Sequence, residues 1–320
     1  MLNLSQYKLS DHSKWDDFVA ASGNGTIFHR LNFLSYHKEK FKKNEHHLVW
    51  MKGDELFSLL PLGIFEVDGK KIARSSFGAS WGGFVYKNMR LKYAEEMVEG
   101  LIEYLKKENV TELYITFPPV CYYQNYSNYF EFLLFQKNFI SVKRELSSVL
   151  DLRINVAEPI LNFDSSARTQ VRKSEKAGIR VIHNVPMKDI YPLIDENRKR
   201  LGSTPTHTLE ELEYLSHTLP ASVLNTVAEF ENKIIACNVC FISNNCAVSM
   251  YPSYDKNYGK LSPMNLLFYN TIEWCINNKL TFFDFGLLTW DMKIVNWGLV
   301  EFKESLGAKG YFRDTYHRVL

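Results

Sequence analysis

The stretch SPMNLLFYNTIEWCINN (residues 262–278) and the run FFDFG (282–286) that follows it decide the fold. Ser262 is a natural N-cap, and Pro263 suits the first helical position because the missing N–H of proline is not needed there. Nearly the whole circumference of this helix is apolar, which is typical of a buried helix. The preceding run CAVSMYPSY (246–254) predicts a strand. The sequence therefore predicts a buried helix that connects two parallel strands.

Length and composition indicate a globular protein with two cores. The chain has 320 residues, of which 46% are hydrophobic and 23% are charged, and this length corresponds to about two domains. No apolar run reaches the length of a membrane span, and the first residues lack the pattern of a signal peptide. The 5 cysteines have no framework spacing, so we expect a reducing compartment, the cytoplasm. A net charge of +2 gives no general attraction to nucleic acid or to an anionic membrane, and it leaves room for a local basic patch.

The two halves of the chain show the same order of elements: helices, then an antiparallel meander, then a helix that crosses to a further strand. In the first half, helices are predicted over 12–22, 30–41, 90–110 and 127–138, and strands over 47–51, 55–67, 111–118 and 139–152. In the second half, helices are predicted over 165–177, 187–201, 208–219, 263–278 and 297–306, and strands over 179–183, 222–231, 233–242, 246–254, 281–286 and 310–320. We therefore predict two α+β domains, residues 1–150 and 151–320, with mixed, mostly antiparallel sheets and crossover helices.

Three motifs of the second half carry a resemblance to a known family. They are RTQVRKSEKAGIRV (168–181), the crossover helix with its FFDFG strand, and FKESLGA (302–308). In this order and spacing they resemble the FemAB-type acyltransferases, which pair two domains of the Gcn5-related N-acetyltransferase (GNAT) fold. The resemblance covers most of the chain, although no motif of the first domain matches residue by residue. It implies a tandem GNAT-like fold and an acyltransferase without a tightly bound cofactor.

The resemblance also implies a class of substrates. Short members of the family transfer an amino acid from aminoacyl-tRNA to peptidoglycan precursors, and relatives acylate sugar amines in polysaccharide pathways. The glycine-rich loop that holds coenzyme A in simple GNAT enzymes is absent, and YGKLSP (258–263) takes its place. We therefore expect aminoacyl-tRNA in preference to acyl-CoA as donor, with Lys260 and the helix beginning at Pro263 offering positive potential to a phosphate.

Four residues are candidates for chemistry. Arg168 and Arg172 lie four residues apart on one helix, where they suit a phosphate-rich partner; the alternative is a solvated basic face. In the family that this chain resembles, the lysine at the position of Lys303 faces the reaction centre. An ammonium there stabilises the oxyanion that forms when the donor carbonyl is attacked. The alternative is that Lys303 is a surface lysine. Asp284 is either the base for the attacking amine or a partner of neighbouring backbone N–H groups. We expect Arg168, Arg172 and Lys303 to line one cleft.

Further residues carry weaker predictions. Trp81, in FGASWGGFVY (77–86), either stacks on a sugar ring of the acceptor or packs a tight turn. His207 is expected in a loop between helices, where it either lines a cleft or has no special role. Cys237 and Cys240 form a C-x-x-C on a predicted strand, so their side chains face apart, and no metal site is expected.

These residues support three functional hypotheses. The first is an enzyme that moves an acyl or aminoacyl group onto an amine of a cell-envelope precursor, such as a peptidoglycan peptide or an amino sugar. The second is a non-catalytic protein of the same fold that recognises a sugar nucleotide or a partner. The third, a nucleic-acid-binding module, is disfavoured by the near-neutral charge. The sequence identifies neither the acyl group nor the oligomeric state.

Overall fold

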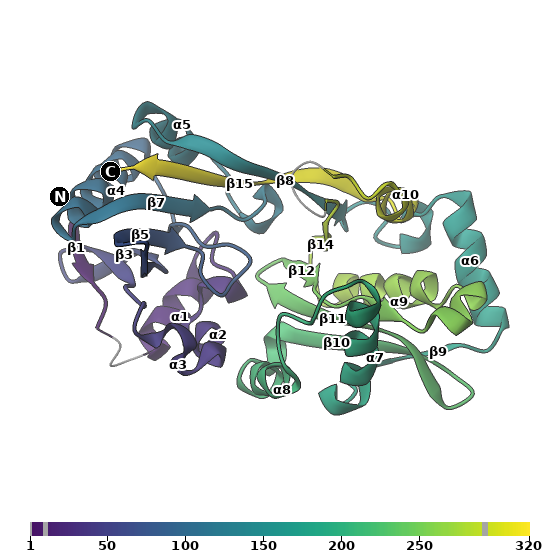
Figure 1. The fold of residues 1–320 in the computed structure, drawn as a ribbon. Coiled ribbons are helices and arrows are strands. Elements are labelled where there is room, and N and C mark those ends of the chain that lie inside the picture. The colour runs from purple at the N-terminus through teal and green to yellow at the C-terminus, as the bar shows by residue number, and fades with distance from the viewer. Residues whose placement is uncertain (1, 9–11, 290–293) are drawn as a thin grey trace. The chain divides into compact units, whose positions relative to one another are not determined.

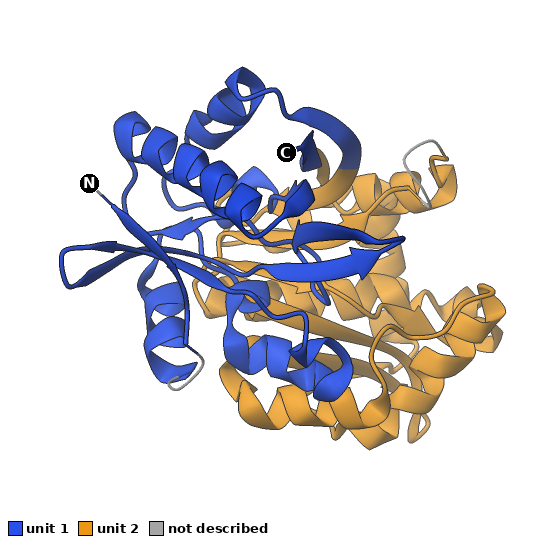
Figure 2. Ribbon diagram, turned by 60° about the vertical axis from the view of Figure 1, so that its left-hand side comes forward, with its two compact units in different colours: residues 1–145, 312–320 blue, residues 146–311 orange. Residues whose placement is uncertain are grey.

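A computed structural model describes residues 2–8, 12–289 and 294–320 of the chain. The chain divides into two compact units, shown in blue and orange in Figure 2. Unit 1 contains residues 1–145 and 312–320, and unit 2 contains residues 146–311. Each unit has its own hydrophobic core and is described separately.

Unit 1 contains two small sheets. The first has the order β1-β2-β3-β6, formed by Asn3–Gln6, Leu48–Lys52, Glu55–Leu60 and Val85–Tyr86. The second has the order β4-β5-β7-β15, formed by Gly63–Val67, Lys70–Ser75, Val110–Thr116 and Lys309–Val319. β5 and β7 are parallel, and helix α4 (Leu91–Lys107) connects them. The buried face of α4, which includes Met97, Leu101 and Leu105, packs into the core of this unit. The remaining helices are α1 (His12–Ala21), α2 (Leu31–Leu34), α3 (Glu39–Lys42) and α5 (Tyr129–Gln136).

Unit 2 is built around a larger sheet with the order β8-β14-β12-β11-β10-β9. Its strands are β8 (Ile140–Asp151), β9 (Arg180–His183), β10 (Val223–Phe230), β11 (Lys233–Ser243), β12 (Cys246–Ser249) and β14 (Phe282–Leu287), and β13 (Ser253–Tyr254) also pairs with β11. Its helices are α6 (Ser165–Lys176), α7 (Met187–Arg200), α8 (Leu209–Thr218), α9 (Pro263–Asn277) and α10 (Trp297–Ser305). The apolar helix α9 packs across β10 and β11, as Figure 1 shows. α9 connects the parallel strands β12 and β14, as predicted.

The predicted duplication of topology is therefore confirmed, because each unit has a parallel pair of strands connected by a buried helix. The units differ from the predicted domain ranges at the C-terminus. Residues 312–320 belong to unit 1 because β15 pairs there with β7, from Thr315 opposite Thr116 to Val319 opposite Glu112. β8 and β15 each span the boundary, so both units contain part of each strand, whereas the sequence predicted two self-contained domains.

Three predicted elements are interrupted in the structure. The helix expected over 30–41 is broken at Lys38, whose φ of 50° is left-handed. The strand expected over 55–67 breaks at Pro61, because proline has no N–H to donate to the ladder. The strand expected over 246–254 is two strands, β12 and β13, separated by a bulge. Strand β1 was not predicted.

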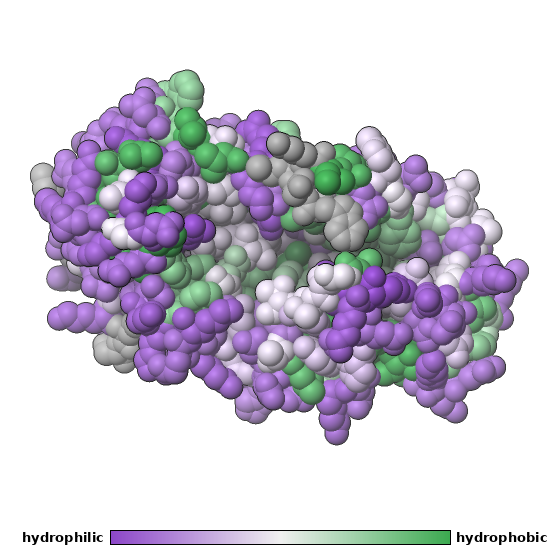
Figure 3. All heavy atoms as spheres, in the orientation of Figure 1, coloured by the Kyte–Doolittle hydropathy of each residue, from purple (hydrophilic) through white to green (hydrophobic). Residues whose placement is uncertain are grey.

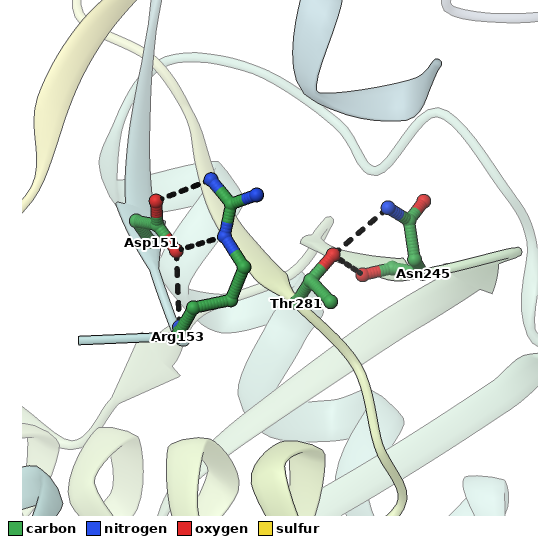
Figure 4. Close-up of polar contacts among 4 residues, drawn as sticks. All are labelled: Asp151, Arg153, Asn245 and Thr281. Carbon is green, nitrogen blue, oxygen red and sulfur yellow. Dashed lines mark hydrogen bonds and ion pairs between the residues drawn. The ribbon is translucent and has the colours of Figure 1, made fainter. Parts of the chain in front are cut away.

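Polar contacts fix the register of the parallel pair in unit 2 (Figure 4). Thr281, just before β14, accepts a hydrogen bond on its hydroxyl from the amide of Asn245, just before β12, at 2.8 Å. The backbone N–H of Thr281 donates to the carbonyl of Asn245, also at 2.8 Å. On the other side of β14, Asp151 at the end of β8 accepts two hydrogen bonds from the guanidinium of Arg153. These contacts align the beginnings of β12 and β14 and so place Asp284 opposite Val248.

A helix that spans a membrane needs about 20 consecutive, mostly apolar residues. Within the described ranges, no helix is both long enough and apolar enough to cross a bilayer.

Candidate active site

Asp284 lies in the middle of β14 with its carboxylate buried. The side chain is 1% exposed, and its Oδ1 accepts hydrogen bonds from the hydroxyl of Ser147 at 2.6 Å and from the N–H of Gly286 at 2.7 Å. The flanking residues Phe283 and Phe285 pack into the core with α9, so Asp284 faces the opposite side of the sheet. Two roles were predicted for Asp284: base for the attacking amine, or partner of neighbouring backbone N–H groups. The hydrogen bond from the Gly286 N–H corresponds to the second role.

Gly286 turns the chain immediately after Asp284. Its φ of 79° lies in the left-handed region, and the pairing of β14 with β8 shifts register between Asp284 and Leu287. A Cβ atom at position 286 would make only ordinary contact, 3.6 Å from the carbonyl oxygen of Ser249. The glycine is therefore required by backbone conformation and not by space. The turn directs the carbonyl groups of Gly286 and Leu287 toward α10.

Lys303 reaches these carbonyl groups from the last turn of α10. Its Nζ donates to the carbonyl oxygens of Gly286 at 2.8 Å and Leu287 at 2.9 Å. The residue is 5% exposed, so it is not the surface lysine that the sequence left open as an alternative. An ammonium group has three N–H donors, and no third acceptor is present among the described residues. One N–H of Lys303 therefore lacks a protein acceptor within the described ranges.

Two opposing effects determine the protonation of Lys303. Burial lowers its pKa from 10.5 to about 8, while the negative charge of Asp284 acts in the opposite direction. Burial disfavours the charged amine because the ammonium loses its hydration, and a nearby carboxylate partly compensates. The amine is therefore mostly charged at neutral pH and loses its proton near pH 8.

The end of α10 explains the FKESLGA motif. The N–H groups of Leu306 and Ala308 donate to the carbonyl of Lys303, and the N–H of Gly307 donates to the carbonyl of Glu304. Gly307 has a φ of 85°, and a Cβ there would lie 2.6 Å from the carbonyl oxygen of Asn162. Only glycine fits this helix end, which fixes the turn that carries Lys303.

The arginine helix α6 begins next to the end of α10. The N–H of Asp164, the N-cap of α6, donates to the carbonyl of Ser305 at 2.8 Å. Arg168, which is half-buried, and Arg172, which is exposed, lie on one side of α6, and neither guanidinium makes a hydrogen bond or ion pair with any described residue. Both guanidinium groups are therefore available to a ligand. Their expected convergence with Lys303 in one cleft stays a prediction.

The loop that replaces the coenzyme A loop folds into a short 3-10 helix, Lys256–Leu261. Its N–H groups are used locally: Tyr258 donates to the carbonyl of Asp255, and Ser262 donates to that of Gly259. Ser262 precedes α9, as expected, but its hydroxyl does not cap the helix; it donates to Gln170 of α6 at 2.6 Å. The sequence could not show this because Gln170 lies 92 residues away. Lys260 is exposed beside the beginning of α9.

Comparison with known proteins agrees with this geometry. Residues 163–303, which contain the arginine helix, the crossover unit and Lys303, match the acetyltransferase (GNAT) domain family. Unit 2 therefore contains a GNAT-like domain. No curated protein sequence matches the chain.

Solved structures extend the likeness from this GNAT domain to the whole chain. FemX superposes with a TM-score of 0.77 at 12% identity, covering 99% of this chain and 97% of FemX. The C-terminal domain of a putative lysylphosphatidylglycerol synthetase from Agrobacterium fabrum gives 0.62 at 12% identity, covering 95% and 90%. A tandem GNAT protein from the clavulanic acid biosynthesis pathway gives 0.57 at 12% identity, covering 100% and 98%. The predicted tandem GNAT-like fold is confirmed. The match of residues 163–303 to an acetyltransferase domain agrees with the predicted acyltransferase class. Such a domain requires an acyl donor and an amine acceptor.

Trp81, in unit 1, is buried in an aromatic cluster. It is 2% exposed, its Nε1 donates to the hydroxyl of Thr26 at 3.0 Å, and its ring packs against Phe28 and Tyr122 with centroids 4.6 Å apart. This arrangement matches the packing alternative and leaves no ring face open for a sugar. A tight aromatic turn and a sugar platform have the same composition, so the sequence could not distinguish them.

A second group of polar residues in the GNAT domain surrounds His207, which lies between α7 and α8 as expected. His207 is buried: its Nδ1 lies 2.5 Å from the hydroxyl of Tyr251, and its ring meets Phe241 edge-on. Arg198 of α7 donates to the carbonyl of Met250 at 3.3 Å and lies over the ring of Tyr251. The N–H groups of Met250 and Tyr251 both point to the carbonyl of Val239, which marks a β-bulge. The irregular run MYPSY was the available signal for this bulge.

The cysteines of the GNAT domain belong to its core. Burial raises the pKa of Cys237 to about 12 and raises that of Cys240 further, so both remain protonated thiols. Within the described ranges, no group of three or more His, Cys, Asp or Glu side chains is arranged to hold a metal ion.

Proposed function

We propose that this acyltransferase moves an aminoacyl or acyl group from an activated donor to an amine of a cell-envelope precursor in the cytoplasm. The observation that carries the proposal is Lys303, a buried lysine with one N–H available, held beside Asp284 in the GNAT domain. The burial of Lys303 and its position beside Asp284 support the catalytic hypothesis over the non-catalytic one, because titratable groups with perturbed pKa values cluster at functional sites.

The chemistry requires few groups. The acceptor amine attacks the carbonyl carbon of the donor ester or thioester, and the C–O or C–S bond to the leaving group breaks as the amide bond forms. The proton lost by the amine balances the proton gained by the departing oxygen or sulfur. The available N–H of Lys303 donates to the carbonyl oxygen as negative charge develops on it. Asp284 holds the Gly286 turn and favours the charged form of Lys303.

Local structure supports aminoacyl-tRNA over acyl-CoA as donor. A diphosphate is normally cradled by several free backbone N–H groups. In residues 256–262 several of these groups are bonded within the 3-10 helix. Lys260, Arg168 and Arg172 instead offer side-chain cations that suit the spaced phosphates of a nucleic acid end.

The acceptor class rests on fold likeness. FemX and the lysylphosphatidylglycerol synthetase domain share the fold across most of the chain, and their names point to the cell envelope. We extend this to an amine of a peptidoglycan peptide or an amino sugar. The test is to supply the purified protein with such acceptors and with either charged tRNA or acetyl-CoA, and to follow amide formation by mass spectrometry. Efficient turnover with acetyl-CoA and none with charged tRNA would overturn the donor assignment.

A further inference from the structure

The backbone carbonyl of Ser249, the last residue of β12, faces β14 at the point where these parallel strands stop pairing. The register between them ends at Asp284. Hydrogen bonds in a parallel pair involve alternate residues, and here the N–H of Phe282 donates to the carbonyl of Asn245 at 3.1 Å. If this pattern continued along both strands, the N–H of Gly286 would donate to the carbonyl of Ser249.

Asp284 diverts that donor. The N–H of Gly286 donates to the carboxylate of Asp284 at 2.7 Å, and the pairing of β12 with β14 ends before it reaches Ser249. A Cβ atom on Gly286 would lie 3.6 Å from the carbonyl oxygen of Ser249, so the turn lies against this oxygen without donating to it. In the described part of the chain no other group donates to it. Ser249 is 6% exposed, and a buried carbonyl without a donor is costly, so this oxygen indicates a place for a ligand.

The end of β12 is held on the side away from β14. The hydroxyl of Ser249 donates to Oδ1 of the buried Asn238 in β11 at 2.8 Å. Beyond it, the N–H groups of Met250 and Tyr251 both point to the carbonyl of Val239, also in β11. These bonds keep the carbonyl of Ser249 from moving toward β14 to find another donor, so the separation of the two strand ends is part of the fold.

The carbonyl of Ser249 and the amine of Lys303 lie beside the same turn. Nζ of Lys303 donates to the carbonyl of Gly286, and one of its N–H groups lacks a protein acceptor in the described ranges. Gly286, Leu287 and Met250 are each half-buried, so this turn reaches the surface of unit 2. Where Figure 1 has β12 and β14, Figure 3 shows pale and green residues, in contrast to the purple, hydrophilic residues at the right-hand end of this unit. A hydrogen-bond acceptor and a donor therefore lie together in a weakly polar part of unit 2.

We propose that the carbonyl oxygen of Ser249 binds an N–H of the amine substrate, an inference that rests on the proposed function. An amine donates hydrogen bonds, whereas a carboxylate, phosphate or ether oxygen has no hydrogen to donate to a carbonyl. Bound at Ser249, the amine lies at the turn where Lys303 donates to the carbonyl oxygen of the donor. This placement brings the two reacting groups together before the attack. Asp284 contributes by keeping the N–H of Gly286 away from the oxygen that the amine uses.

Carbonyl NMR tests this hydrogen bond directly and without turnover. Ser249 and Met250 form the one Ser–Met pair in the sequence. Labelling serine at the carbonyl carbon and methionine at the nitrogen with NMR-active isotopes therefore gives a single signal for this peptide bond. The probe is Nα-acetyl-lysinamide, a primary amine. Its matched control is the Nε-trimethyl derivative, which keeps the positive charge but has no N–H on that nitrogen.

Two variants of Asp284 test the origin of the unpaired carbonyl. Asp284→Asn keeps an oxygen that accepts from the N–H of Gly286, so its signal should respond to the probe as in the wild type. Asp284→Leu removes this acceptor and frees the N–H of Gly286 for the carbonyl of Ser249. The signal of Asp284→Leu should therefore lie downfield without a ligand and should not respond to the probe. Circular dichroism and the melting temperature verify folding; if Asp284→Leu does not fold, the two ligands on the wild type decide the question.

We expect the carbonyl carbon of Ser249 to shift downfield to a plateau as Nα-acetyl-lysinamide is added, and to stay in place with the trimethyl derivative. An equal shift with both compounds, or no shift with either, would overturn the proposal. The proposed function is judged separately by amide formation. An amine-dependent shift without amide formation would support the site and contradict the transfer, whereas turnover without the shift would contradict the site alone.

Discussion

The Nζ atom of Lys303 lies 2.8 Å from the carbonyl oxygen of Gly286, a residue 17 positions earlier in the chain. This bond joins the last turn of α10 to the bulge of β14 and removes the lysine from water. Because Asp284 also holds the N–H of Gly286, the carboxylate and the amine are fixed to opposite sides of the same turn.

The first prediction concerns the pH dependence of the reaction. The pKa of Lys303 is about 8, so the ammonium loses its proton above this pH and can no longer donate to the oxyanion. We expect kcat to fall above about pH 8. The measurement is a pH profile of kcat at saturating donor and acceptor. A profile that rises continuously to pH 10 would contradict a role for the ammonium.

Asp284→Asn should shift that profile in a defined direction. The charge of Asp284 raises the pKa of Lys303, so its removal lowers this pKa, and the alkaline limb should move to lower pH by roughly one unit. Asparagine keeps an oxygen that can accept from Ser147 and Gly286, so the fold should survive. Ser147→Ala is the control, because it removes a hydrogen bond without removing charge; an equal shift in this variant would assign the effect to geometry.

The pH dependence of the free energy of unfolding tests the protonation of Lys303 independently of catalysis. In the folded protein the pKa of Lys303 is about 8, below the 10.5 of an unfolded chain, so the unfolded state binds more protons between these values. Lys303 therefore contributes a rise of ~2 kcal/mol in unfolding free energy between pH 7.5 and 10, while the buried thiols Cys237 and Cys240, whose pKa values are raised, contribute a fall. Urea denaturation at both pH values should give a change in unfolding free energy that is more positive in the wild type than in Lys303→Met by about this amount. Parallel pH dependences in the two proteins would mean that Lys303 is not titrating.

Gly286→Ala should damage the site more than a matched glycine elsewhere. Alanine at a φ of 79° is strained by ~1 kcal/mol, and relief of the strain would rotate the carbonyl groups that hold Lys303. Gly178→Ala is the control in the same unit, because it has a φ of 85° and open space around its Cβ. We expect similar losses of stability but a loss of kcat only at position 286. Equal kcat values for the two variants would show that catalysis does not depend on the turn at Gly286.

The arginine pair should act on substrate binding. Arg168→Ala/Arg172→Ala should raise the KM for the phosphate-bearing substrate by about tenfold or more, with kcat and the melting temperature little changed, because both side chains lack protein partners in the described structure. Lys173→Ala, an exposed residue of the same helix, is the control. A KM unaffected by the double substitution would show that the basic row is a solvated face.

Much of this site could be predicted from local sequence. The helix beginning at Pro263, the strand with Asp284 and the helix end at Gly307 each depend on neighbouring residues, so periodicity and glycine positions indicate them. The burial of Lys303 could not be predicted this way, because it depends on carbonyl groups of a distant strand. The bond from Ser262 to Gln170 was missed for the same reason, and the two alternatives for Trp81 stayed open because its partner Thr26 is distant in sequence.

Because Lys303 is buried, the residue that replaces it must fill the same space. A surface lysine would tolerate Lys303→Ala with an unchanged melting temperature, but at 5% exposure alanine would leave a cavity. Methionine has a similar length and no charge, so Lys303→Met removes the N–H donor with less disturbance of packing.

The most direct test of the account is a single-turnover transfer assay that compares the wild type with Lys303→Met. Donor-saturated enzyme is mixed with an amine acceptor, and amide formation is followed by rapid quench and mass spectrometry. The account predicts a loss of at least about a hundredfold in the transfer rate, the scale of one oxyanion donor, with the folded state verified by circular dichroism. A folded Lys303→Met variant that transfers at the wild-type rate would contradict it.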